Sequence, residues 1–119
     1  MKKITIGVNI FKMTKKLTNR HNNYRLPRKV GIIYSEVKRR YFPTKAQYLT
    51  EKDSFGEAKI IASYLRKMGI RVSLYPGDAQ LPQKLQRSRP NVILNLASSV
   101  KGNEWLASTI PAVLELLDI

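Results

Sequence analysis

The chain has 119 residues, of which 43% are hydrophobic, a composition that suits one small globular domain with its own core. It carries 22 Lys and Arg residues against 8 Asp and Glu, a formal net charge of +14, so acidic partners are favoured over basic ones. The absence of cysteine excludes disulfides and thiolate metal sites, and no apolar run is long enough to span a bilayer. We therefore expect a cytoplasmic protein without membrane attachment.

The basic residues are concentrated in the first part of the chain. Residues 1–45 hold 13 of them and a single acid, Glu36, for a net charge of +12, whereas the rest of the chain has a net charge of +2. This distribution predicts weak polyanion binding at low salt. We interpret the segment as a solvated arm, because its basic residues show no spacing that fits one defined groove.

The chain opens with a strand pattern and continues into a polar stretch. Between residues 4 and 10, apolar side chains alternate with small polar ones, and this period of two indicates a half-buried strand. Residues 11–27 are polar and basic with little periodicity, as in a linker. The sequence therefore predicts a basic N-terminal strand and arm over residues 1–27, followed by one α/β domain over residues 28–119.

From residue 29 onward, strand and helix patterns alternate. Strands are predicted at Val30–Tyr34, Ile70–Tyr75 and Asn91–Leu96, and helices at Asp53–Met68, Leu81–Arg89 and Glu104–Leu117. Ser35–Thr50 is expected to be a long basic loop, and Pro111 predicts a kink or a late start in the last helix. The alternation predicts a three-layer α/β fold of flavodoxin-like type, with a mainly parallel sheet flanked by helices.

The clearest helix is the first one. Ser54 and Glu57, three residues apart, predict a capping box at its start, and Gly69 predicts its C-terminal stop. Its apolar side chains share one face. That face comprises Ala58, Ile61, Ala62, Leu65 and Met68.

Signatures of autonomous nucleotide or metal binding are absent from the sequence. The first strand of the alternating series is followed by Ser35 and Glu36 rather than by a glycine-rich phosphate loop, and no Walker A sequence occurs. One histidine, His21, and eight scattered carboxylates predict no metal site. We therefore expect this chain by itself to hold no cofactor, and to bind neither ATP nor Mg²⁺ tightly.

Three segments, taken in order, carry a family resemblance. Residues 54–65 read Ser-Phe-Gly-Glu-Ala-Lys-Ile-Ile-Ala-Ser-Tyr-Leu, residues 90–96 read Pro-Asn-Val-Ile-Leu-Asn-Leu, and residues 110–119 read Ile-Pro-Ala-Val-Leu-Glu-Leu-Leu-Asp-Ile. They resemble the first helix, a Pro-Asp-Val-Val-Phe-Asn strand and the closing helix of D-alanine–D-alanine ligases. The resemblance covers roughly residues 29–119 and implies the pre-ATP-grasp domain, the N-terminal domain that precedes the ATP-grasp module in that family.

The resemblance implies a function. In such carboxylate–amine ligases, ATP phosphorylates a carboxylate and an amine attacks the acyl phosphate. This chain would be the N-terminal substrate-cleft domain, inactive alone, and its partners would be a small amino-acid-like substrate and the ATP-grasp module of the same protein. The ATP and Mg²⁺ that the full-length ligase needs would be held by that module, beyond Ile119.

The resemblance also implies site residues. Glu51 is the nearest match to the acid that holds a substrate ammonium. Because ligands of α/β folds lie outside the carboxyl ends of the strands, the loop after the third predicted strand is the expected site wall. Ser98, Ser99, Gly102 and Asn103 of that loop would offer backbone N–H groups to a substrate carboxylate. No catalytic residue and no metal ligand is expected within this chain.

A second class of function stays open, that of a small α/β binding module whose basic arm binds nucleic acid or another polyanion. Aromatic residues that interleave with the basic ones, as base-stacking platforms do, are Tyr24, Tyr34, Tyr41, Phe42 and Tyr48. No signature of an RNA- or DNA-binding fold accompanies them. We favour the ligase domain, and a reading frame that continued into ATP-grasp lysines and acidic Mg²⁺ ligands would discriminate between the two.

Overall fold

The computed structural model describes the backbone of residues 2–5 and the whole of residues 25–119. The strands are β1 (Lys2–Thr5), β2 (Lys29–Tyr34), β3 (Arg71–Pro76) and β4 (Val92–Asn95). The helices are the 3₁₀ turn η1 (Arg39–Tyr41), α2 (Lys45–Glu51), α3 (Ser54–Lys67), α4 (Leu81–Ser88), α5 (Glu104–Ala107) and α6 (Thr109–Leu116). None of the described helices is long and apolar enough to cross a membrane.

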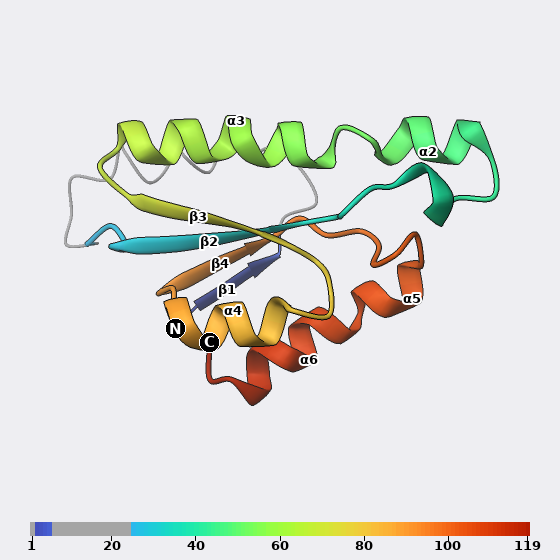
Figure 1. The fold of residues 1–119 in the computed structure, drawn as a ribbon. Helices are drawn as coiled ribbons and strands as arrows, with labels where there is room; N and C mark the ends of the chain where they lie inside the picture. Colours follow the sequence, from blue (N-terminus) through green and yellow to red (C-terminus); the bar gives the residue numbers. More distant parts are fainter. Residues whose placement is uncertain (1, 6–24) are drawn as a thin grey trace.

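The strands form one parallel sheet in the order β1-β4-β2-β3 (Figure 1). Strand β2 is central and pairs with β3 from Lys29↔Arg71 onward and with β4 from Val30↔Val92 onward. The prediction of an α/β fold with a mainly parallel sheet flanked by helices is confirmed. Of the strand predicted over residues 4–10, the structure describes residues 4 and 5, which belong to β1. The remaining residues of that strand and the arm that follows lie outside the described residues.

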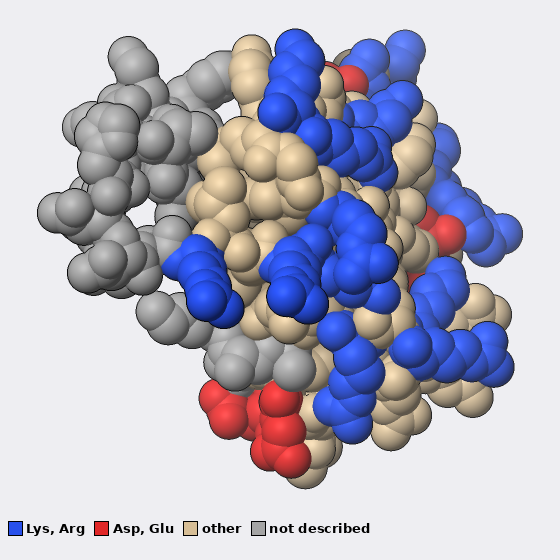
Figure 2. Space-filling model, turned by 90° about the vertical axis from the view of Figure 1, so that its left-hand side faces the viewer, with Lys and Arg blue, Asp and Glu red and all other residues tan. Residues whose placement is uncertain are grey.

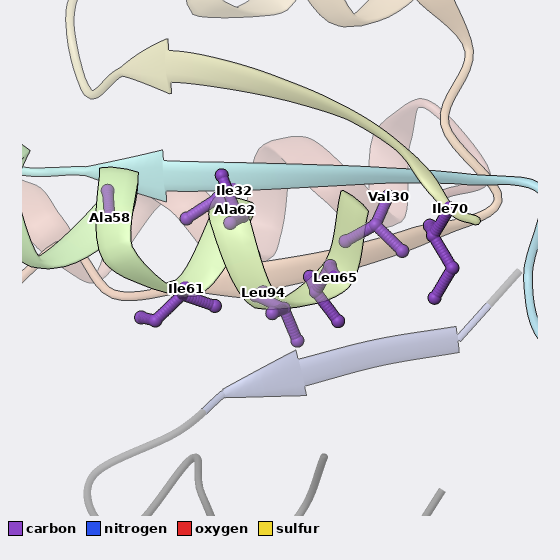
Figure 3. Packing of buried hydrophobic residues seen from close by; sticks show 8 residues of the cluster. All are labelled: Val30, Ile32, Ala58, Ile61, Ala62, Leu65, Ile70 and Leu94. Carbon is purple, nitrogen blue, oxygen red and sulfur yellow. The ribbon is translucent and has the colours of Figure 1, made fainter. Parts of the chain in front are cut away.

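Helices cover both faces of the sheet, α3 on one side and α4 with α6 on the other (Figure 1). Successive side chains of a strand point to opposite faces, so Ile32 packs beneath α3 while Ile33 packs against α4 and α6. Figure 3 shows the α3 side, where one stripe of the helix meets the sheet. Its buried side chains are Val30, Ile32, Ala58, Ile61, Ala62, Leu65, Ile70 and Leu94.

The helical face of α3 is confirmed, but the predicted capping box is wrong. The N-cap residue is Asp53, and no side chain caps the helix. Ser54 instead accepts a hydrogen bond from the Ser35 backbone N–H, at 2.9 Å, through its Oγ. The Ser54 hydroxyl therefore bonds to the residue after β2 instead of capping its own helix.

The prediction of one long loop after β2 is wrong. The segment contains η1 and helix α2, which begins where the Thr44 hydroxyl accepts a hydrogen bond from the Gln47 N–H, at 3.2 Å. This is ordinary N-capping, and Thr followed three residues later by Gln signals it in the sequence. Phe42, 8% exposed, anchors the segment in the fold, and its ring lies 6.3 Å from that of Tyr48.

The C-terminal helix is split, as Pro111 predicted. Helix α5 ends before Ser108, and α6 begins at Thr109. Pro111 therefore stands in the first turn of α6, where a missing N–H removes no bond within the helix. The late start is confirmed, and it allows Ile110 and Leu114 to pack into the core beneath the sheet.

Candidate functional site

The order of the strands creates one topological switch point, between β2 and β4. From β2 the chain leaves through α3 to β3 on one side, and from β4 it leaves through α5 and α6 on the opposite face (Figure 1). The loops after these two neighbouring strands therefore diverge at the carboxyl edge of the sheet. Ligands of open α/β sheets bind at such a divergence.

Ser35, the first residue after β2, connects the two loops. It is 1% exposed, and its Oγ accepts hydrogen bonds from the Ser98 N–H at 2.9 Å and from the Ser99 N–H at 3.3 Å. Its own N–H donates to Ser54 Oγ. A single buried hydroxyl thus ties the end of β2 to the loop after β4 and, through its backbone, to the start of α3.

Glu51 joins this cluster from the end of α2. The Ser98 hydroxyl donates to Glu51 Oε2 at 2.9 Å, and Ser98 Oγ lies 3.4 Å from Ser35 Oγ. Because Ser98 has one hydroxyl proton and gives it to the carboxylate, the Ser35 hydroxyl is the donor of the longer contact. The result is a chain of hydrogen bonds from a buried hydroxyl to a half-buried carboxylate.

Two further polar side chains are buried at this edge. Asn95, 6% exposed, accepts a hydrogen bond from the Ala97 N–H at 3.2 Å and so bends the chain as it leaves β4. Ser99 is 2% exposed, and its Oγ has no hydrogen-bond partner among the described residues. A buried hydroxyl without a hydrogen-bond partner costs free energy.

The rest of the predicted wall is a tight turn. Val100 and Asn103 exchange two backbone hydrogen bonds, of 3.0 and 2.9 Å, across Lys101 and Gly102, whose φ angles of +52° and +74° follow the type I′ pattern. A Cβ at Gly102 would stand 2.3 Å from the Tyr41 carbonyl oxygen, so the turn lies directly against η1. Glycine is required here by both its φ angle and its packing.

The structure thus brings together three of the five predicted site residues. Glu51, Ser98 and Ser99 lie in one hydrogen-bonded cluster, whereas Gly102 and Asn103 build the adjoining turn and the start of α5. The backbone N–H groups of residues 98, 99, 100 and 103 already have acceptors within the protein. The Asn103 side chain accepts from the Trp105 N–H at 2.9 Å.

Sequence reasoning missed Ser35 and Ser54 as members of the cluster. Ser35 carried one usable signal, its position directly after a strand with a buried centre, at the expected ligand-binding edge. Ser54 carried a misleading one, because the same residue fits a local helix cap. The hydrogen bond between Ser35 and Ser54 depends on how α3 packs on the sheet, and the spacing of the two residues in the sequence does not predict it.

Tyr34, the last residue of β2, precedes the cluster, and its surroundings raise the pKa of its phenol. Burial raises the pKa of its phenol above the usual value, and the negative charges of Glu36 and Asp78 raise it further. Its ring contacts Phe55 of α3 at a centroid distance of 4.9 Å. The phenol therefore stays protonated and uncharged well above neutral pH.

No cluster of potential metal ligands occurs among the described residues.

Comparison with known proteins yields no relative. No protein-family model matches the chain, and no match is found among curated proteins or among solved structures.

Proposed function

We propose that this chain forms the N-terminal wall of the substrate cleft in an ATP-dependent carboxylate–amine ligase of the kind it resembles in sequence. The observation that carries the proposal is the placement of the Glu51 carboxylate. It lies at the carboxyl edge of the sheet, hydrogen-bonded to Ser98, which is 47 residues away in the sequence. This is the edge at which an α/β domain meets its ligand.

The cluster suits the binding of a substrate amine. The Ser98 hydroxyl donates a hydrogen bond to one oxygen of the Glu51 carboxylate. Within residues 25–119, the salt bridge with a nitrogen–oxygen distance below 4.0 Å is that between Lys38 and Glu36, and it does not involve Glu51. No described cation therefore neutralises Glu51, whose second oxygen is available to an ammonium group. A charge-assisted hydrogen bond of this kind is about twice as strong as a neutral one.

We propose that the substrate carboxylate is bound by another part of the ligase. The N–H groups of residues 98, 99, 100 and 103 are bonded inside the protein, so they do not form a ready anion site. We therefore assign to this domain the recognition of the amine. ATP, Mg²⁺ and the activated carboxylate would be held by the ATP-grasp module, which would supply the phosphoryl transfer.

The first test uses the chain alone. In ¹H–¹⁵N NMR, D-alanine and L-alanine should shift the amide signals of Glu51, Ser98 and Ser99 at millimolar concentration. Propionate, which lacks the ammonium group, should not. The shifts should disappear in Glu51→Gln and persist in the matched control Glu57→Gln, whose carboxylate is exposed on α3. Shifts that persist in Glu51→Gln, or none with either amino acid, would contradict amine recognition.

The second test uses the natural reading frame. If it continues into an ATP-grasp module, the full protein should release ADP only when an amine and a carboxylate substrate are both present. Glu51→Gln should raise KM for the amine by about 10- to 100-fold with little change in kcat, because a charge-assisted hydrogen bond contributes roughly 1.5–3 kcal/mol. A frame that continues into no ATP-binding module would refute the ligase assignment.

A further inference from the structure

The edge of the sheet opposite the Glu51 cluster is strongly basic. The strands start at this edge, and the helices that cross back over the sheet end there (Figure 1). We call the exposed cations at these positions the amino-edge surface. Its residues are Arg28, Arg66, Lys67, Arg71, Arg87 and Arg89. Figure 2 faces this side of the molecule and shows Lys and Arg over much of its described part.

The net charge along the sequence does not predict this surface. The rest of the chain after residue 45 is nearly neutral in total, yet five of the six cations come from it. The fold separates the charges, because carboxylates gather in the loops and at the helix ends on the other edge of the sheet. Those carboxylates are Glu36, Glu51, Asp53, Glu57, Asp78 and Glu104. At the amino edge, Glu115 lies in the last turn of α6 and Asp118 follows the helix.

Helix ends alone do not account for so much positive charge. The C-terminus of a helix is equivalent to about half a negative charge. The partial charges at the ends of α3, α4 and α6 would therefore be neutralised by between one and two cations. Lys29 already supplies one, since its ammonium donates to the Ser88 carbonyl oxygen at the end of α4. Arg89 donates to the Leu117 carbonyl oxygen at 2.7 Å. The remaining cations exceed what the helices and the two carboxylates neutralise.

From these observations we propose that the amino-edge surface binds the phosphate backbone of nucleic acid. Five of its six cations are arginines, whose planar guanidinium groups bind phosphate oxygens in pairs. They come from the starts of two strands and the ends of two helices, so they form a spread surface rather than the charged stripe of one membrane-binding amphipathic helix. Binding through phosphates alone is independent of base sequence. The surface is distinct from the Glu51 cluster and independent of the ligase proposal.

The test compares two variants of the full chain that have the same net charge. In the edge variant, Arg28, Arg71 and Arg87 are replaced by glutamine; in the control variant, Arg40, Lys45 and Lys52 are replaced by glutamine. All six are exposed, and each variant lowers the net charge from +14 to +11. Binding of a DNA duplex of about 20 base pairs is measured by fluorescence anisotropy from roughly 50 to 300 mM salt.

The edge variant should bind at least about 10-fold more weakly than the control at roughly 100 mM salt. The slope of its plot of log K against log salt should be shallower by about 2.7, the change expected for three lost phosphate contacts. A second duplex of unrelated sequence should give the same affinities, and both variants should keep the wild-type melting temperature. Equal losses in the two variants would overturn the proposal, because net charge or the arm would then explain the binding. Tighter binding to vesicles containing anionic lipid than to the duplex would also overturn it.

Discussion

Replacing Ser35 by alanine removes the hydroxyl that joins the loops after β2 and β4. Its Oγ accepts from the N–H groups of Ser98 and Ser99, at 2.9 and 3.3 Å, in a position that is 1% exposed. Each buried donor left without an acceptor costs about 1–3 kcal/mol. Since the second bond is long and therefore weaker, we expect the free energy of unfolding to fall by about 2–4 kcal/mol in total.

Urea denaturation followed by circular dichroism measures this change. The matched control is Ser63→Ala, a serine exposed on α3, where alanine should change the stability by no more than about 0.5 kcal/mol in either direction. Hydrogen exchange gives the local readout, because the amides of Ser98 and Ser99 should lose protection in Ser35→Ala. If Ser35→Ala unfolds within about 0.5 kcal/mol of the wild type, and the two amides stay protected, the assignment of Ser35 as the link is wrong.

Three further perturbations probe the fold at other points. Ile61→Asp places an unpaired charge beneath α3 and should unfold the domain, since the cost is several kcal/mol; a soluble variant with an unchanged melting temperature would contradict the core described here. Gly102→Ala should destabilise by at least about 1 kcal/mol through its positive φ and the 2.3 Å approach to Tyr41, whereas Gly56→Ala, with nothing within 4 Å inside a helix, should stabilise by about 0.5–1 kcal/mol in the same urea assay. The pKa of Tyr34 is raised in the folded state, so the protonated phenol favours the fold at neutral pH and this stability is lost as pH rises through the folded-state value. Between about pH 9 and 11, thermal unfolding of Tyr34→Phe should therefore fall less steeply with pH than that of the wild type, and identical slopes would show that Tyr34 does not contribute.

The sequence by itself determined which segments form the sheet and its covering helices. Val30–Tyr34 and Val92–Leu94 are runs of apolar residues because their strands are covered on both faces. The helical period of Ala58, Ile61, Ala62 and Leu65 likewise identifies the single apolar stripe of the first helix, which is buried against the sheet. The break near Pro111 also follows from local chemistry alone. Helix α2 could have been predicted as well, since Thr44 and Gln47 form a local cap that requires no distant partner.

Only the tertiary structure decided the strand order, and with it the residues that meet in the Glu51 cluster and in the amino-edge surface. The order β1-β4-β2-β3 places Ser35 beside Ser98, 63 residues further along the chain, and gives the Ser54 hydroxyl to β2 instead of to its own helix. It also gathers arginines from separate elements at one edge and six carboxylates at the other. Sequence patterns report the environment of each residue along its own element, whereas these contacts arise from how the elements pack.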